Sequence, residues 1–464
     1  MTSRQGGLLE LVARGKKDVF FTNNPTVSYY NNVFRTAAPV VTEVYTYNPR
    51  NRPEWGKWVD FDLEHRGDLV NKLHLRIQLP TWLPTVAAAA NPIGIVTDNS
   101  GNTFGYCNKV GYQMIHKIQF FQDTILLHEA YGEYLDWRLQ NSYETGTLQL
   151  TGLNVGSRED TPLAIGRSAT TPMMRVAIPV MGWQQLGDPG FPTCVLRKQR
   201  FRIRVWLREL QEIVVCSDGR LFPTPWDGMP LRVQTATNGP IDTSMITLPL
   251  SALKYPEISL ETTQRYVGNE TRLFLQSQTV RFPFRHIQFQ QFAMEHNYVV
   301  LASPPYSSAV NIPYRIDFIG PSDRFTVGFR TNANTKAGQR NILSPMVNTM
   351  RLNIANIDRI KSWDMAVFRE VTAYWKQIRM AIDRNQVPLE IYTISYGGMD
   401  GATPSGTVSF TRATDPVLHV TVRSNPDIDP RLPSDRGGMA LVYSESWNVL
   451  EARDGYGRLM FDDS

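Results

Sequence analysis

The chain has 464 residues, of which 42% are hydrophobic and 11% aromatic, and its formal net charge is +5. This length predicts two or three domains, each long enough to bury its own core. Basic and acidic residues are interspersed, so the concentrated basic stripe of a nucleic-acid-binding protein is missing, and no apolar run predicts a transmembrane helix or a signal peptide.

Residues 1–25 are predicted to form an N-terminal arm. A short apolar cluster between Leu8 and Val12 is followed by basic residues between Arg14 and Lys17, and Pro25 ends any helix. Because the segment is too short to fold alone, we expect it to become ordered only against a partner.

Residues 26–215 are predicted to form one β-rich domain. Apolar and polar residues alternate through this region, which is the period of a strand with one buried face. The predicted strands are 58–63, 73–79, 116–122, a short strand after a turn at Gln122-Asp123, 174–180 and 201–210. Toward Trp137 the apolar spacing becomes helical. Two long polar connections, 82–110 and 143–172, separate these strands, and connections of this length in compact domains usually have a function.

Residues 216–230 contain three prolines and two glycines, which predicts a linker. The strand pattern then restarts in a second β-rich domain, residues 231–464. The strands predicted there are 246–250, 258–261, 273–285, 298–302, 315–319, 325–329, 389–396, 408–411, 417–422 and 440–449. Apolar residues at three- and four-residue spacing predict one helix, over residues 361–385.

Two successive β-rich halves, each with room for about eight strands, predict an all-β fold. The natural architecture is two consecutive eight-stranded jelly rolls, a double jelly roll, with short helices in the inter-strand loops. Periodicity alone leaves other pairs of β-sandwiches or barrels open.

The sequence lacks the residue patterns of common catalytic and metal sites, such as Cys-x-x-Cys, His-Glu-x-x-His and Gly-x-Ser-x-Gly. We therefore predict no enzymatic activity, no catalytic residues, no metal ligands and no cofactor. The three cysteines are too few for a disulfide framework, which favours folding in a reducing compartment. The acidic loop of Asp427, Asp429 and Asp435 lacks the glycine and the glutamate of a calcium loop. Asn269 stands in the only N-glycosylation sequon.

Several blocks of the sequence share one further property, which is their resemblance to a known family. The blocks are Gly6–Gly15, Arg66–Leu73, Gly111–Trp137, Pro404–Arg412, Trp447–Leu450 and Gly455–Gly457. In this order they resemble the major capsid proteins of nucleocytoplasmic large DNA viruses, a double jelly-roll family. The segment Tyr131–Trp137 carries most of the resemblance. Two segments depart from the family pattern, Glu451–Asp454 and Leu186–Val195, and they leave a minor capsid paralogue open.

The resemblance implies a structural capsid protein. Three chains would form a homotrimer with a pseudo-hexameric outline, and trimers would tile the icosahedral shell of a large double-stranded DNA virus. The implied partners are neighbouring capsomers and, through residues 1–25, minor capsid proteins and the inner membrane. The implied location is the virion capsid, after assembly in the host cell cytoplasm. A carbohydrate-binding β-sandwich protein is the alternative class, although no carboxylate pair is spaced to predict glycoside cleavage.

Overall fold

A computed structural model describes part of the chain, and the account below is confined to that part. The described residues are 39–80, 95–97, 103–140, 155–156, 173–178, 190–216, 231–235, 242–246, 255–294, 310–331, 347–368, 391–396, 406–422 and 438–461. The predicted arm, the predicted strand at 298–302, the acidic loop of Asp427, Asp429 and Asp435, and most of the connection 143–172 lie outside the described residues.

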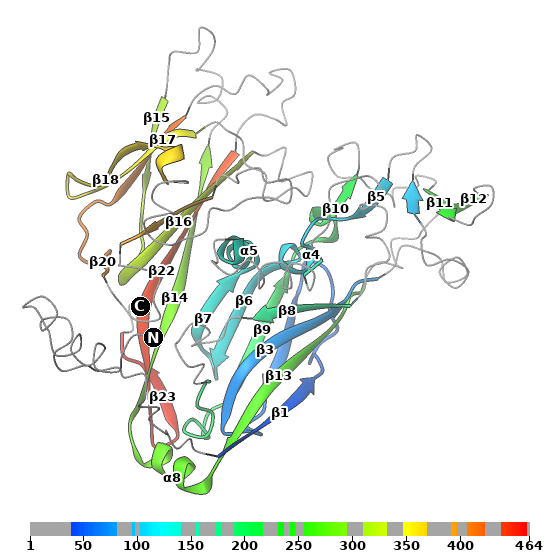
Figure 1. Cartoon of the computed structure of the whole chain (residues 1–464), viewed down its shortest axis with the longest axis vertical. Coiled ribbons are helices and arrows are strands. Elements are labelled where there is room, and N and C mark those ends of the chain that lie inside the picture. Colours follow the sequence, from blue (N-terminus) through cyan, green and yellow to red (C-terminus); the bar gives the residue numbers. More distant parts are fainter. Residues whose placement is uncertain are drawn as a thin grey trace, which may run out of the picture. The chain divides into compact units, whose positions relative to one another are not determined.

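The first half of the fold is a pair of four-stranded antiparallel sheets (Figure 1). One sheet has the order β1 (Val40–Tyr47), β13 (Glu257–Val267), β3 (Leu69–Gln78), β8 (Met174–Ile178). The other has the order β2 (Trp58–Leu63), β9 (Phe201–Leu207), β6 (Ile115–Gln122), β7 (Ile125–Tyr131). Numbered along the chain, these eight strands have the orders 1-8-3-6 and 2-7-4-5. Two such sheets make an eight-stranded jelly roll.

The second half repeats this strand order. Its first sheet has the order β14 (Val280–Met294), β22 (Gly438–Arg453), β16 (Pro321–Thr331), β19 (Ile391–Ser395). Its second sheet has the order β15 (Val310–Arg315), β21 (Val417–Val422), β17 (Val347–Ile354), β18 (Ile357–Asp364). Two short strands, β20 (Val408–Ser409) and β23 (Tyr456–Leu459), pair with β16 and β22. The predicted double jelly roll is therefore confirmed.

The change from the first jelly roll to the second lies later in the chain than predicted. β13 follows the predicted linker at 216–230, yet it pairs with β1 and β3 of the first jelly roll. The helix α8 (Asn269–Ser277) then leads into β14. The domain boundaries at 215 and 231 are thus wrong as limits of the sheets, because the proline- and glycine-rich segment lies in the connection between the seventh and eighth strands of one jelly roll.

A fifth sheet is built from the long connections of the first jelly roll. Its order is β10 (Val214–Cys216), β5 (Thr103–Tyr106), β4 (Ile95–Thr97), β11 (Leu231–Thr235), β12 (Asp242–Ile246). β4 and β5 lie within the predicted connection 82–110, and β10, β11 and β12 come from the connection between β9 and β13. Two excursions far apart in sequence therefore pair with each other. The short helices α4 (Val110–Gln113) and η1 (Leu210–Glu212) flank this sheet in sequence.

The period-two pattern correctly identifies the buried face of β9, but not that of β6, where His116 is exposed and Gln119 is buried. Every second residue of β9, from Phe201 to Leu207, is buried, and the residues between them are half-buried. The predicted turn at Gln122-Asp123 is also confirmed, since Asp123 has a positive φ of 52° and β7 returns antiparallel to β6. Helix α5 (Gly132–Gln140) follows, as the spacing toward Trp137 predicts.

Three predicted elements are wrong in part. Of the predicted strand 315–319, only Arg315 belongs to a strand, β15. Residues 273–277, predicted as strand, belong to α8. Residues 361–364, predicted as the start of a helix, belong to β18, while residues 365–368 are helical and 369–385 lie outside the described residues. The reason is a tight turn at Ala355 and Asn356, both with positive φ, which folds β18 back onto β17. Short apolar runs do not distinguish the period of a helix from that of a strand, so pairing with β17 decides the conformation of residues 361–364.

Candidate functional site at the junction of the jelly rolls

Three aromatic residues of the first jelly roll lie against one sheet of the second. Tyr131 ends β7, and Tyr134 and Trp137 follow on α5 at three-residue spacing, which places them on one face. Their rings lie 5.8, 5.1 and 5.3 Å from the ring of Tyr443 on β22, measured between centroids. Phe289 on β14 stacks on Tyr443 at 4.7 Å. The junction therefore has an aromatic centre.

Gly328 on β16 allows this close approach. A Cβ atom at this position would lie 2.2 Å from the ring of Trp137, which is itself fully buried. No side chain could be placed there without moving the indole, because real carbon contacts are far longer. The glycine is thus required by packing between the two jelly rolls.

A buried carboxylate, that of Glu445 on β22, lies beside the aromatic centre. Its side chain is only 2% exposed. It accepts hydrogen bonds from the hydroxyl of Tyr134, from Arg138 Nη1 at 3.1 Å and from Arg285 Nη1 at 3.0 Å. Two of these donors, Tyr134 and Arg138, belong to the first jelly roll, so the carboxylate joins the two halves.

Further charges complete this cluster within the second jelly roll. Arg324 Nη1 lies 3.7 Å from Glu445, and Arg285 Nη2 lies 3.0 Å from Asp323, which also accepts a hydrogen bond from Trp447 Nε1 at 3.1 Å. Burial acts to raise the pKa of Glu445, but the three arginines outweigh it and hold that pKa well below its usual range. Burial raises the pKa of Asp323. A buried ionic group is stabilising only when its partners stay in place.

The junction continues along β14 and β23. His128 on β7 is buried and packs edge-on against Phe284, with 6.3 Å between ring centroids. Nearby, Gln122 Nε2 donates to the carbonyl of Gly457 at 2.7 Å, and Gly457 N donates to Gln199 Oε1 at 2.7 Å. Backbone and side-chain groups of the two jelly rolls therefore contact each other beside β14 and β23 as well as at the aromatic centre.

The burial of His128 makes the protein sensitive to acid. Burial, with a smaller contribution from His286, lowers the pKa of His128 from 6.5 to about 3. The folded protein therefore keeps this imidazole neutral, and stability is lost as the pH falls below 6.5. Lowering the pH from 6.5 to 4.5 is expected to cost about 2 kcal/mol through this residue.

Chemical denaturation across this pH range would measure the loss. The variant His128→Gln, which cannot be protonated there, is expected to show a flatter pH profile. His419→Gln is the matched control, because its imidazole on β21, beside Asn311, is only half-buried. Burial lowers its pKa as well, so this substitution should flatten the pH profile less than His128→Gln does. An unaltered slope in His128→Gln would contradict this account.

The junction contains some of the residues that the sequence singles out, but not others. Tyr131–Trp137, the segment with the strongest family resemblance, supplies its first-jelly-roll side. His128 is buried against Phe284, and Glu129 accepts a hydrogen bond from Gln119 Nε2 at 2.6 Å. Glu445, Arg285, Arg324 and Gly328 were not predicted. The one signal available was Glu445 itself, a charged residue in the predicted strand 440–449 with Tyr443 and Trp447 two positions to either side.

Within the described residues no group of three or more His, Cys, Asp or Glu side chains is arranged to hold a metal ion. Among the helices of the described segments, none has the length and apolar character needed to cross a membrane. Cys107 and Cys194 are buried free thiols, and burial raises the pKa of Cys194 to about 11.

Comparison with known sequences gives partial matches to viral capsid proteins. No protein-family model matches the sequence. Probable capsid protein 4 of Acanthamoeba polyphaga mimivirus is 24% identical over 215 residues, which cover 45% of this chain and 38% of that protein. The major capsid protein of Chrysochromulina ericina virus is 26% identical over 144 residues, covering 28% of this chain and 25% of that protein. The matches thus span less than half of these relatives.

Comparison with solved structures extends over nearly the whole chain. PBCV-1 VP54, in a crystal structure fitted into a reconstruction of the virophage Sputnik, aligns with 94% of this chain and 100% of its own, with a TM-score of 0.69 and 12% identity. The Faustovirus major capsid protein aligns with 95% of this chain and 94% of its own, with a TM-score of 0.59 and 12% identity. At these identities the structures establish the fold, which is a double jelly roll. Together with the sequence matches, this makes the chain similar in fold and in part of its sequence to the double jelly-roll capsid proteins of large DNA viruses.

Proposed function

We propose that this protein is the major capsid protein of a large double-stranded DNA virus, and that it forms pseudo-hexameric homotrimers that tile an icosahedral shell. The observation that supports this most is the repetition of one strand order in both halves. Three chains with two similar domains each can enclose a ring of six similar units, whereas a chain with one jelly roll would give a three-lobed ring. Closed rings of this kind are built from heterologous contacts, in which one surface of a subunit meets a different surface of the next subunit.

The junction supports the same proposal. A capsomer has to keep its two jelly rolls in one relative orientation if its outline is to fit a lattice. The buried contacts of Glu445 and the packing of Trp137 on Gly328 provide such a fixed orientation. A closed homotrimer of this size would bury an interface on the order of 2,000 Å² or more.

The remaining parts of the proposal concern location and partners. The protein would lie in the virion capsid, after assembly in the host cell cytoplasm, and would contact neighbouring capsomers. Residues 1–25 would reach minor capsid proteins and the inner membrane, and their basic residues would suit acidic partners or lipid head groups. We propose no enzymatic activity and no specific nucleic-acid partner, on the basis of the motifs absent from the sequence.

Light scattering during size-exclusion chromatography tests the proposal. The expected mass is three times the chain mass of 52.8 kDa. The same sample applied to immobilised glycans distinguishes the alternative class, because a monomer that binds glycans would favour a carbohydrate-binding protein. A stable monomer without glycan binding would also contradict the trimer.

A further inference from the structure

Exposed apolar side chains gather at the end of the fold where α8 connects β13 to β14 (Figure 1). They are Val40 and Val41 of β1, Ile125 and Leu126 of β7, and Leu273 and Phe274 of α8, each at least 39% exposed. Val40 pairs with Val267, just before α8, and Asp123, in the turn before β7, donates its N–H to the carbonyl of Arg200 at 2.7 Å. Apolar residues exposed together mark an interaction surface.

Helix α8 turns polar side chains toward the first jelly roll. Arg272 Nε lies 3.6 Å from Asp68 Oδ1, and Gln276 Nε2 donates to the carbonyl of Cys194 at 3.2 Å. No residue of the helix is buried, and both residues of the pair Leu273–Phe274 are 57% exposed. A helix at the surface of a domain normally turns its large apolar residues inward. The polar contacts therefore hold α8 in a position that displays this apolar pair.

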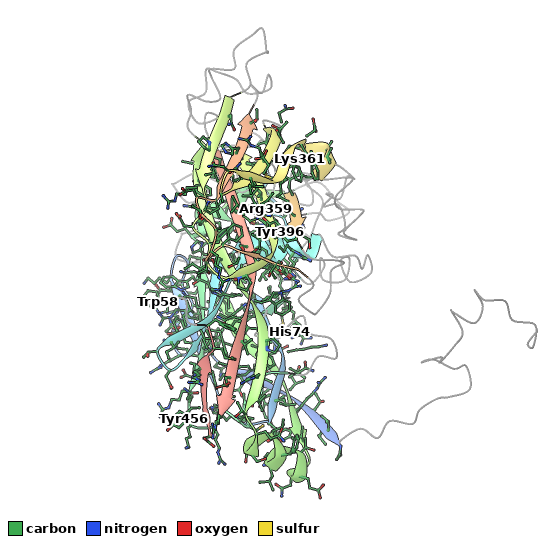
Figure 2. All side chains as sticks on the ribbon, turned by 90° about the vertical axis from the view of Figure 1, so that its left-hand side faces the viewer. Trp58, His74, Arg359, Lys361, Tyr396 and Tyr456 are labelled. Carbon is green, nitrogen blue, oxygen red and sulfur yellow. The ribbon has the colours of Figure 1, made fainter. Side chains whose placement is uncertain are left out.

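A basic turn, Arg197–Arg200, lies beside α8. Its two arginines and Lys198 are exposed. Lys198 N donates to the carbonyl of Gly455 at 3.2 Å, and a Cβ atom on this glycine would lie 2.8 Å from Lys198 Cγ, so the lysine stem passes directly over it. Lys198 Nζ lies 4.8 Å from the ring centroid of Tyr456, which is 56% exposed (Figure 2). The lysine is thus held in place, which reduces the entropy lost on binding a partner.

The charge balance at this end is positive. Around α8 and the basic turn the exposed cations are those of the basic turn with Arg272 and Arg453, and the exposed carboxylates are those of Asp123, Glu270 and Asp454. Arginine and lysine beside exposed leucine and phenylalanine are typical of surfaces that bind anionic lipid, because the cations contact the head groups and the apolar side chains leave water. The apolar residues stand on three separate elements, which suits a broad lipid surface better than a single peptide.

We propose that α8, the basic turn and Tyr456 bind the surface of an anionic lipid bilayer. Leu273 and Phe274 would enter the head-group region, and the basic turn would contact the phosphate and carboxylate groups of the lipids. The inference rests on the proposed membrane contact and assigns it to the folded part of the chain, not to residues 1–25 alone. In a symmetric trimer three copies of the surface would bind together, which strengthens a weak single site.

Flotation of the full chain with vesicles tests the charge of this surface. The wild type should bind vesicles of phosphatidylcholine mixed with phosphatidylserine, and should bind phosphatidylcholine alone much more weakly. Arg197→Glu with Lys198→Glu should weaken binding about 25-fold or more, because each cation at an anionic surface increases binding about fivefold. Arg359→Glu with Lys361→Glu on β18 is the matched control, since it changes the net charge equally at exposed residues distant from α8 (Figure 2).

A second pair of variants tests the apolar contact. Leu273→Ser should weaken binding to the anionic vesicles about fivefold or more, because the leucine leaves water on binding. Ile357→Ser is the matched control, since Ile357 on β18 is 58% exposed and Leu273 is 57% exposed. Both control variants should bind as the wild type does. Unchanged melting temperatures would show that the variants fold, and Arg197→Gln with Lys198→Gln is a milder change if they do not.

Three results would overturn the inference. They are a wild type that binds neither kind of vesicle, which would leave an acidic protein as the occupant, substitutions in the basic turn and at Leu273 without effect, which would assign lipid binding to another segment, and equal losses in the control variants. Light scattering of the same samples separates this inference from the proposed capsomer. A trimer that binds no vesicles would leave the capsomer standing, whereas a monomer that binds them would contradict the trimer alone.

Discussion

Replacing Glu445 by glutamine is expected to destabilise the protein by about 3 to 5 kcal/mol. The substitution keeps the size and shape of the side chain but removes its negative charge. Arg138 and Arg285 would then be left buried without the carboxylate to which they donate at 3.1 and 3.0 Å. The loss of free energy is measured by chemical denaturation at pH 7.

Asp317→Asn is the matched control. Asp317 pairs with Arg315 at 3.2 Å, and both side chains are largely exposed, so this ion pair is expected to contribute less than about 1 kcal/mol. If Glu445→Gln cost no more than this control, the buried cluster would not hold the two jelly rolls together.

Replacing Trp137 by alanine is expected to cost a similar amount, about 3 to 5 kcal/mol, because the indole is fully buried between α5 and β16. Trp58→Ala is the control, since Trp58 is 41% exposed and contacts mainly Trp206, with 5.1 Å between ring centroids. We expect a loss near 1 kcal/mol for the control, the usual contribution of an aromatic pair.

The same contact predicts coupling between Trp137 and Gly328. Gly328→Ala alone should cost about 1 to 3 kcal/mol, because the new methyl group would overlap the indole. In a Trp137→Ala background the methyl group has room, so the cost of Gly328→Ala should fall by about 1 kcal/mol or more. Additive losses in the double variant would show that the two residues do not contact each other.

Local patterns were sufficient to predict most strands and the fold class. The alternation from Phe201 to Leu207 and from Trp58 to Leu63 predicts β9 and β2, because a half-buried strand imposes a period of two. The repeated β-rich halves and the family resemblance together predicted two jelly rolls. These features depend on neighbours in sequence or on composition.

The errors concern features that depend on partners outside the segment itself. β13 has a typical strand pattern, but nothing in that pattern shows that it pairs with β1 and β3 rather than with later strands. The strand character of residues 361–364 depends on pairing with β17. Glu445 looks like an ordinary outward residue of a strand until α5, more than 300 residues earlier in the chain, covers it. Composition and period carry no information on such contacts.

Electron microscopy of the purified oligomer tests the central claim most directly. Averaged images viewed along the symmetry axis should show three chains in a ring with six lobes of similar size and a hexagonal outline. Each lobe would be one jelly roll, and neighbouring lobes would alternate between contacts within a chain and contacts between chains. A particle with two chains, or a three-lobed ring in which the jelly rolls of each chain are not side by side, would contradict the proposed capsomer.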